Sequence, residues 1–428
     1  MRTLIALIPL FAATLGAVEL ADGLTLSGWG KQYLGVTGMQ DNVTPPDVAA
    51  YEPQGTVQQT LRLRLFYKPI DWFSAETAWQ VSPTVSQMGG NALTGLFAPS
   101  LNDYRITDLL DTLYTSPAGQ VAFPHSLDRL TVTFSLPFMD IYAGRQAISF
   151  GAAKFINPTD VFAPLSFQDI NREEKVGVDA VRVKFPLGEM NELDAGYVFG
   201  PDGRFSKSAA FVRAKFALWE TDISLMLVEY QYNLLSGLSI ERAIGGAGVW
   251  LEAAYTADTI FKESERMSPG IHGDINGNDD FRLSVGADYN FAEANLVLFG
   301  EYHFSLVGTL RPSQYLENIW PGTGEKAYSD SGVYLLGQHY LAVGFTWEIV
   351  PLLNGSLQTL INLTDGSLLL SPRLEYSVAD DLFWDVGASI GAGVTARQGD
   401  FMGFIYPVPR SEFGLYPYTV YTTMRLYF

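Results

Sequence analysis

The feature that most constrains this chain is the alternation of apolar and polar residues in short stretches from Leu24 to the C-terminus. Residues 60–66 read Thr-Leu-Arg-Leu-Arg-Leu-Phe, and residues 281–289 read Phe-Arg-Leu-Ser-Val-Gly-Ala-Asp-Tyr. A repeat of two residues indicates β-strands with one apolar and one polar face, because successive side chains of a strand point to opposite sides. The alternation therefore predicts an all-β protein.

About eighteen such segments follow one another, and each is close to the ~9–11 residues with which a tilted strand crosses a lipid bilayer. We expect strands at 24–35, 57–68, 72–82, 128–136, 138–148, 178–186, 191–199, 206–218, 220–232, 236–243, 247–257, 279–290, 294–306, 333–349, 352–363, 366–378, 381–394 and 418–428.

The connections between these segments differ in length on the two sides. Tight connections, such as 68–71 and 244–246, alternate with long ones, such as 83–127 and 149–177. Short turns on one rim and long loops on the other are typical of a bacterial transmembrane barrel, whose closure pairs every backbone group that hydrocarbon would leave unsatisfied. We predict a transmembrane antiparallel up-and-down β-barrel of about 18 strands, with short periplasmic turns and long extracellular loops. The alternative, a secreted multi-sheet protein, does not explain the loop asymmetry.

Both ends of the chain agree with export to the outer membrane. Residues 1–17 combine a basic residue, an apolar run and small residues, which is the layout of a signal peptide with cleavage near Ala17 or Ala21. No later apolar run reaches the length of a helical span, so 22–428 is expected to form a single barrel domain. The last strand ends on Phe428, which resembles the assembly signal of Gram-negative outer-membrane barrels. We expect contacts with membrane lipid and lipopolysaccharide, and docking of the C-terminal strand to the barrel-assembly machinery.

The polar strand faces are expected to line a lumen. Charges of both signs on a pore wall can form separate ladders that orient polar solutes and select ions, or they can pair and fill the bore. With 46 Asp+Glu against 27 Lys+Arg the net charge is -19, which argues against a nucleic-acid partner. The residues expected in the lumen are Arg62, Arg64, Arg129, Arg182, Lys184, Arg213, Lys215, Arg282, Arg373, Arg425, Glu252, Asp288, Glu301 and Glu375.

The connection 149–177 is a candidate constriction. Its run from Asn157 to Asp160 suits a turn and a helix start, because Pro158 fixes one backbone dihedral and Thr159 or Asp160 can accept hydrogen bonds from free amides. The connection either folds into the lumen or forms an outward cap held by ion pairs. The residues expected near a constriction are Arg145, Asn157, Asp160, Arg172, Glu173, Glu174 and Lys175.

The same region carries a resemblance to a known group of barrels. Gly144-Arg145-Gln146 is followed by Phe150-Gly151, by the Asn-Pro-Thr-Asp turn at 157–160, and by a returning segment rich in Arg and Glu at 172–182. This pattern resembles the alginate-export-like group of outer-membrane barrels over residues 100–200, with Phe150 where that group has Trp. The resemblance implies an eighteen-stranded barrel, a long loop folding toward the lumen, and an arginine-rich conduit for an acidic solute.

Two other polar clusters invite a chemical interpretation. His303 shares a strand face with Glu301 and Ser305, a conceivable Ser/His/acid set, yet any polar strand face supplies such neighbours. The other cluster offers oxygen ligands for Ca²⁺, although its order does not fit an EF-hand loop and a plain turn is the alternative. That cluster consists of Asp274, Asn276, Asn278 and Asp279. Since the chain has no Cys and no recognised catalytic motif, we expect neither an enzyme nor a cofactor.

These observations predict an outer-membrane channel, or porin, for small hydrophilic solutes, with anionic solutes as a candidate class. A structural or adhesive barrel with a closed lumen is the alternative, and a barrel hydrolase is the third hypothesis.

Overall fold

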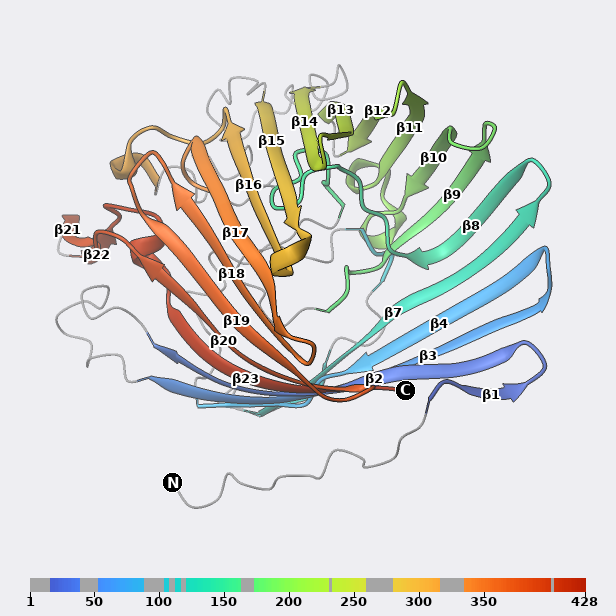
Figure 1. The fold of residues 1–428 in the computed structure, drawn as a ribbon, viewed down its shortest axis with the longest axis horizontal. Coiled ribbons are helices and arrows are strands. Elements are labelled where there is room, and N and C mark those ends of the chain that lie inside the picture. The colour runs from blue at the N-terminus through green and yellow to red at the C-terminus, as the bar shows by residue number, and fades with distance from the viewer. Residues whose placement is uncertain are drawn as a thin grey trace.

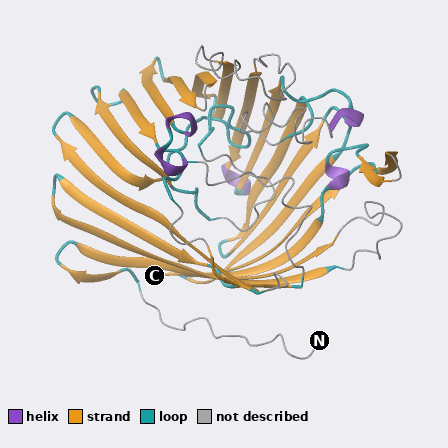
Figure 2. Cartoon of the chain, turned by 180° about the vertical axis from the view of Figure 1, so that it is seen from behind, coloured by secondary structure: helices purple, strands orange, loops and turns teal. Residues whose placement is uncertain are grey.

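A computed structural model describes residues 16–38, 53–87, 104–107, 112–116, 121–162, 173–230, 233–258, 280–315, 335–401 and 404–428. Within these residues, eighteen antiparallel strands form one closed barrel (Figures 1 and 2). No helix in the described residues is long and apolar enough to cross a membrane. Residues 1–15 lie outside the described ranges, and the signal peptide stays a prediction.

Each strand of the barrel pairs with its neighbour in the chain, apart from the pair that closes the ring. The barrel strands are β2 (Leu24–Gly38), β3 (Gln54–Ile70), β4 (Phe73–Val81), β7 (Val121–Leu136), β8 (Met139–Gln146), β9 (Val178–Pro186), β10 (Glu192–Val198), β11 (Ala209–Leu218), β12 (Thr221–Tyr230), β13 (Asn233–Ile244), β14 (Ala247–Asp258), β15 (Asp280–Phe291), β16 (Leu296–Ser305), β17 (His339–Val350), β18 (Leu353–Asn362), β19 (Leu368–Ala379), β20 (Leu382–Ala392) and β23 (Tyr418–Tyr427).

Short elements decorate this ring. β1 extends the sheet beside β2, β5 bridges β3 and β7, β6 pairs with β7, and β21 and β22 form a separate hairpin. Their bounds, with those of the 3-10 helices, are β1 (Val18–Ala21), β5 (Thr84–Ser86), β6 (Thr112–Thr115), β21 (Arg397–Phe401), β22 (Phe404–Val408), η1 (Pro201–Gly203), η2 (Phe205–Lys207), η3 (Ala292–Ala294), η4 (Pro312–Gln314) and η5 (Phe413–Leu415).

The ring closes where the first barrel strand meets the last. β2 and β23 pair from Trp29 with Tyr427 to Gly38 with Tyr418, and in Figure 1 the blue and red ends of the chain lie side by side. Beyond the last strand, Phe428 still exchanges two backbone hydrogen bonds with Gly28, at 2.6 and 2.9 Å. The closure leaves neither strand with an open edge, as the hydrocarbon of a membrane requires.

All eighteen predicted segments coincide with strands, and the predicted fold class is confirmed. The errors are at the ends. β3 and β7 begin earlier than predicted because their outer parts also pair: Gln54 and Gly55 with β2, and Val121 and Ala122 with β5. β17 begins at His339 rather than at 333, because the backbone just before it bonds to other loops, for example Leu336 N to the Glu412 carboxylate.

The outward strand faces are apolar and exposed, as a lipid-facing surface must be. Leu130, Leu225 and Val420, from three separate strands, are each more than half exposed. At the short turns, Trp72 and Trp219 are exposed as well, where interfacial aromatic residues anchor barrels at the headgroup level. The outward face therefore contacts membrane lipid, while polar and charged side chains lie inside.

Candidate pore constriction

The connection after β8 enters the barrel and lies against the inner face of β14. We call its described residues, 147–162 and 173–177, the inner loop; Figure 1 shows its teal trace between the walls. Glu252, fully buried on β14, accepts hydrogen bonds from the backbone N–H of Ala152, Ala153 and Thr159, each at 2.8 Å. The Thr159 hydroxyl adds a fourth at 2.7 Å. Four donors compensate a carboxylate that has left water.

A second carboxylate holds the next residues of the inner loop in the same way. Glu301, on β16, accepts from the backbone N–H of Lys154 at 2.8 Å, Phe155 at 3.3 Å and Ile156 at 2.8 Å, and from Trp250 Nε1 at 2.8 Å. Like Glu252, this carboxylate is almost fully buried. At these two carboxylates the inner loop is thus fastened to the wall mainly through its main chain, with the Thr159 hydroxyl as an added side-chain donor.

Gly151 makes this docking sterically possible. Its φ of +110° lies in the left-handed region, and a Cβ at this position would lie 2.6 Å from Glu252 Oε2. Only glycine avoids both the backbone strain and the clash. The Gly in the Phe150-Gly151 step therefore places the loop backbone directly over the carboxylate.

The other end of the inner loop reaches the wall formed by β23, β2 and β3. Glu173 forms ion pairs with Lys31 Nζ at 2.5 Å and with Arg425 Nη1 at 3.0 Å, while Glu174 pairs with Arg62 Nη2 at 2.8 Å. The described residues of the inner loop therefore touch two separate walls of the barrel. Arg172, predicted for this region, lies outside the described residues.

The two described pieces of the inner loop are also tied to each other. Lys175 Nζ lies 2.5 Å from Asp160 Oδ2, and both side chains bond to the Ser149 hydroxyl. Asn157 Nδ2 donates to the Phe150 carbonyl oxygen at 3.2 Å. Of the predicted constriction residues, Asn157, Asp160 and Lys175 thus brace the loop internally.

Arg145 holds the root of the inner loop rather than facing open space. Its guanidinium donates to Asp179 Oδ1 at 2.7 Å and to the carbonyl oxygens of Leu127 and Thr107, at 2.9 and 2.8 Å. At the preceding position, Gly144, glycine is the only residue type that fits. Its φ is +111°, and a Cβ would lie 2.1 Å from the Leu130 carbonyl oxygen. The Gly-Arg-Gln motif therefore has a structural role here.

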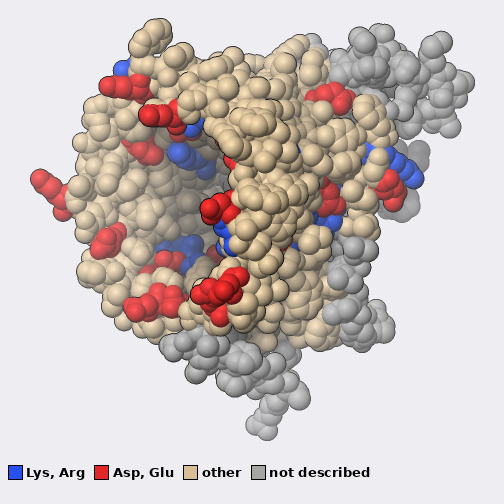
Figure 3. All heavy atoms as spheres, turned by 90° about the vertical axis from the view of Figure 1, so that its right-hand side faces the viewer, with Lys and Arg blue, Asp and Glu red and all other residues tan. Residues whose placement is uncertain are grey.

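Every basic residue predicted to line the lumen has a carboxylate partner, at 2.5–3.3 Å. Figure 3 shows basic side chains on the wall of a hollow, with acidic ones close by. Of the two arrangements that the sequence allows, the structure thus has the paired one. The pairs are Arg62–Asp128, Arg64–Glu76, Arg129–Asp128, Arg182–Asp194, Lys184–Glu192, Arg213–Glu192, Lys215–Asp222, Arg282–Asp280, Arg373–Asp385 and Arg425–Asp385.

Several of these acidic partners were missing from the predicted set. Asp128 sits at a β-bulge of β7, where the register against β4 shifts, so strict alternation with Arg129 assigns it to the wrong face. Glu192 and Asp194 could have been predicted from the sequence, because they alternate regularly on β10 and their spacing alone places them inside. Alternation on β10 therefore predicts acidic side chains beside the inward basic ones, although it does not predict which of them pair.

The acidic residues predicted for the lumen have different surroundings. Glu252 and Glu301 lie beneath the inner loop and do not face open space, so their role is anchoring rather than contact with a solute. Glu375 bridges to Arg425 Nη2 at 2.5 Å. Asp288 accepts from the Gly248 backbone N–H at 3.2 Å and lines an open cavity on the periplasmic side of the loop.

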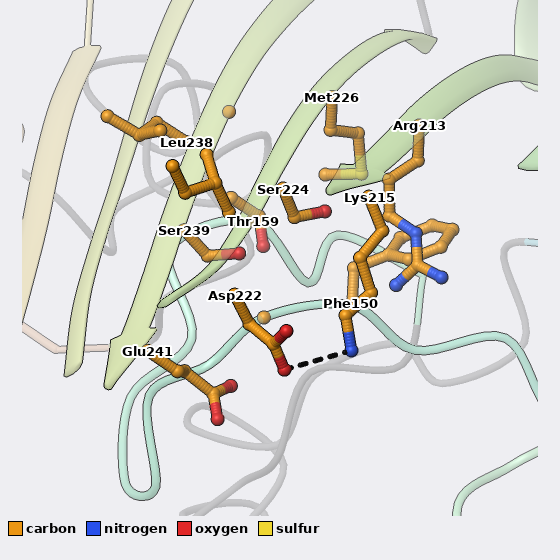
Figure 4. A pocket seen from close by; sticks show the side chains of 13 residues that line it. Phe150, Thr159, Arg213, Lys215, Asp222, Ser224, Met226, Leu238, Ser239 and Glu241 are labelled. Atoms are coloured by element: carbon orange, nitrogen blue, oxygen red, sulfur yellow. Dashed lines mark ion pairs between the residues drawn. The ribbon is translucent and has the colours of Figure 1, made fainter. Parts of the chain in front are cut away.

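The open space lies between the inner loop and the wall of β11, β12 and β13. A cavity of about 150 Å³ is lined there by Phe150 and Thr159 of the loop, and by the Lys215–Asp222 ion pair at 3.2 Å (Figure 4). Arg213 lies over the Phe150 ring, 5.3 Å from its centre. This arrangement offers a passing solute one apolar ring and charges of both signs.

A larger cavity of about 570 Å³ lies next to the first. The two share Asp222 and Glu241 as lining residues, so they adjoin at these side chains. The larger cavity is also lined by Lys154, whose ammonium lies 5.6 Å from the centre of the Trp250 ring. We call these two adjoining cavities, which lie beside the inner loop, the cleft.

The alternative chemical sites gain little from the structure. His303 is buried and its Nδ1 lies 2.8 Å from the Ser284 hydroxyl, while Glu301 is occupied by loop amides. The described residues hold no group of three or more His, Asp or Glu side chains that could bind a metal ion. The calcium candidates Asp274, Asn276, Asn278 and Asp279 lie outside the described residues.

No protein family and no curated protein matches this chain. The fold, however, is that of solved outer-membrane barrels. It is similar to Acinetobacter baumannii OccAB3 (TM-score 0.56, 11% identity, 95% of this chain and 100% of that one covered). It is also similar to Pseudomonas aeruginosa OpdK, solved with vanillate (TM-score 0.55, 9% identity, 95% of this chain and 99% of that one covered). A third similar structure is Pseudomonas aeruginosa OprD (TM-score 0.54, 10% identity, 96% of this chain and 95% of that one covered). The chain thus has the eighteen-stranded fold of bacterial outer-membrane channels, whereas the alginate-export-like resemblance rests on sequence alone.

We predict that Glu301→Ala loosens the inner loop. The substitution leaves four donors without an acceptor, and the two buried ones, the Ile156 N–H and Trp250 Nε1, cost roughly 1–3 kcal/mol each before the loop relaxes. The loop should then detach locally and become cleavable by protease in detergent. The barrel itself should stay folded, which its heat-modifiable migration on gels would show. Glu76→Ala, which removes a partly exposed pair with Arg64, is the control and should leave the loop resistant. Equal protease resistance in both variants would contradict the anchoring role.

Proposed function

We propose that this barrel is a passive outer-membrane channel for small hydrophilic solutes, and that the inner loop is its constriction. The proposal rests on the cleft beside the inner loop, where a cavity lined by the loop adjoins a larger one at Asp222 and Glu241. Barrels of 16–18 strands are wide enough to hold an aqueous path. A structural barrel has no need of charged side chains around open space beside its inner loop.

The neighbouring structures support the same function. OprD and OpdK are described as outer-membrane proteins, and another similar structure is described as a BenF-like porin from Pseudomonas fluorescens Pf-5 (TM-score 0.52, 11% identity, 96% of this chain and 100% of that one covered). At these identities the similarity concerns the fold, so the function of this chain follows from the cleft and its charges. The rival hypothesis, an adhesive or structural barrel, predicts no conduction at all.

Removing the constriction should widen the path. We expect deletion of residues 155–173 to raise single-channel conductance in planar bilayers several-fold, because the loop then no longer crosses the bore. Shortening the exposed periplasmic turn at Glu293 is a matched control outside the path and should leave conductance unchanged. A silent wild-type protein would favour the structural barrel, and unchanged conductance in the deletion would remove the loop from the path.

We propose an anionic preference as the finer part of this function. Its support is that Arg213 and Lys215 line the cleft, although each has an acidic partner. The preference must therefore be modest, since opposite charges a few ångströms apart largely cancel at a distance. It should depend on the most exposed pair in the cleft, Lys215 with Asp222.

The Lys215–Asp222 pair gives a reciprocal test of selectivity. Lys215→Ala leaves Asp222, which lines the cleft beside Glu241, without its basic partner and should shift the reversal potential in a salt gradient toward cations. Asp222→Ala should shift it toward anions, and the double variant should return close to wild type. If neither single variant moves the reversal potential, solutes do not pass beside this pair.

The relation to the alginate-export-like group also belongs to the proposal. Its support is the motif at 144–182, whose Gly144 and Arg145 hold the root of a loop that folds toward the lumen. The conduit for an acidic solute that the resemblance implies agrees with basic side chains in the cleft. The pairing of those side chains weakens the likeness to an unbroken arginine path.

We further propose that the C-terminal strand recruits the barrel-assembly machinery during insertion. The support is the terminal Phe428, which follows an alternating strand and closes against Gly28. Deletion of Phe428 should lower the heat-modifiable, folded fraction in the outer membrane several-fold, while refolding of the purified variant into detergent remains efficient. Equal loss in both settings would indicate a purely structural role for the last residue.

A further inference from the structure

The connection before β23 folds back into the extracellular mouth of the barrel. We call residues 409–416 the mouth segment. It lies on the inner face of β20, where the strand ends in glycines: a Cβ on Gly391 would lie 2.3 Å from the Phe413 carbonyl oxygen, and one on Gly393 would lie 2.3 Å from the Ser411 hydroxyl. Ser411 and Phe413 are fully buried. The fit of the mouth segment therefore depends on two positions without side chains.

A buried carboxylate fastens the mouth segment to the wall. Glu412 is fully buried and accepts from the Leu336 backbone N–H at 3.1 Å, from Asn362 Nδ2 at 2.8 Å and from the Tyr340 hydroxyl. These donors come from the segment before β17, the end of β18 and the start of β17. One side chain thus joins the mouth segment to two neighbouring strands and to a loop.

In the described part of the chain, the groups that surround Glu412 include no basic residue. The other groups that face Glu412 are Tyr340, Tyr315 and Asp365, and Asp365 accepts from the Glu412 backbone N–H at 2.8 Å and from the Tyr315 hydroxyl at 2.7 Å. Burial, with a smaller contribution from the Asp365 charge, raises the pKa of Glu412 to about 7. The neutral carboxyl therefore suits this position better than the ionised one.

The mouth segment belongs to the same buried apolar cluster as part of the inner loop. Phe413 packs against Tyr340 and Tyr416, and the cluster includes Ile156, one of the inner-loop residues held by Glu301. Displacement of the mouth segment would remove Phe413 and Tyr416 from this cluster. The packing of the inner loop is therefore linked to that of the mouth segment through shared apolar neighbours.

We propose that the mouth segment is a pH-sensitive closure of the channel, with Glu412 as its latch. In the closed form the neutral side chain is buried in the Tyr340 and Asn362 cluster, and ionisation releases the segment toward water. This inference rests on the proposed channel function for its consequence, but the movement of the segment can be measured independently of conduction.

The direction of the effect follows from proton linkage. A carboxyl whose pKa is higher in the closed form than the ordinary value of 4.5 favours closure at low pH. This contribution to the free energy of the closed form has its full value below about pH 4.5. It decreases as the pH rises from 4.5 to 7 and does not change further above pH 7. Within this window the ratio of released to closed segment rises at most about tenfold per pH unit.

Cysteine labelling tests the movement directly, because the natural chain has no Cys. Ser411→Cys places a thiol at a fully buried position of the mouth segment, and Ser208→Cys places one at a buried position before β11, outside the segment. The ratio of their labelling rates with a membrane-impermeant maleimide cancels the intrinsic pH dependence of thiolate reactivity. We expect this ratio to rise at least tenfold between pH 5 and pH 7 in the protein reconstituted in liposomes.

Two substitutions made in the Ser411→Cys background sharpen the test. Glu412→Gln mimics the neutral side chain and should keep labelling slow at every pH, while Glu293→Gln in an exposed turn should change nothing. Gly391→Ala should displace the segment and make labelling fast at every pH, whereas Gly300→Ala, whose Cβ would meet its nearest neighbours at an ordinary contact distance of 3.9 Å, should not. A flat ratio for the Ser411→Cys protein, or the same rise with Glu412→Gln, overturns the inference.

Conductance measured over the same pH range separates the two proposals. An increase in conductance that follows labelling and is lost in Glu412→Gln supports both. Labelling that rises while the protein never conducts rejects the channel and the gating role but leaves the movement of the segment established. A conducting channel with a flat labelling ratio rejects the latch alone.

Discussion

In hydrocarbon an unpaired backbone N–H or C=O costs several kcal/mol, and this constraint governs the whole molecule. Eighteen strands can satisfy it only if β2 finds β23, more than 380 residues further along the chain, and the pairing continues to Phe428 against Gly28. A ring of this size encloses more space than its own inward side chains fill. The inner loop and the mouth segment occupy that space, so the need for closure indirectly creates both the constriction and its cleft.

The interior handles buried charge in two ways. On β14 and β16, Glu252 and Glu301 are compensated by backbone amides of the inner loop, with Trp250 adding a donor. On the remaining wall, arginines and lysines are compensated by carboxylates of neighbouring strands. Removing one partner of such a buried pair is costly, because the other is left uncompensated. Most charges in this lumen therefore hold the structure, and few are exposed in the cleft.

The fold followed from the sequence almost completely, because period-two alternation and turn chemistry are local properties. Each of the eighteen predicted strands is present, and the errors occur where strands run beyond the membrane or where a loop captures backbone groups, as at Leu336. The alternation also predicts which side chains point into the barrel, except at the Asp128 bulge. What alternation could not provide was the choice of partner: that Glu301 binds loop amides, or that Arg213 finds Glu192, depends on contacts between distant strands and loops.

The mode of attachment of the inner loop has a consequence for how such a filter can evolve. Because Glu252 and Glu301 accept from main-chain amides, the anchor itself does not depend on the side chain of Lys154, which is exposed and lines the larger cavity, whereas Ala152, Ala153 and Ile156 are buried. Point substitutions at Lys154 could change what the filter admits without a compensating change in the wall. Variants with new permeabilities can therefore be sought first at Lys154, where a change leaves the anchoring contacts and the buried clusters intact.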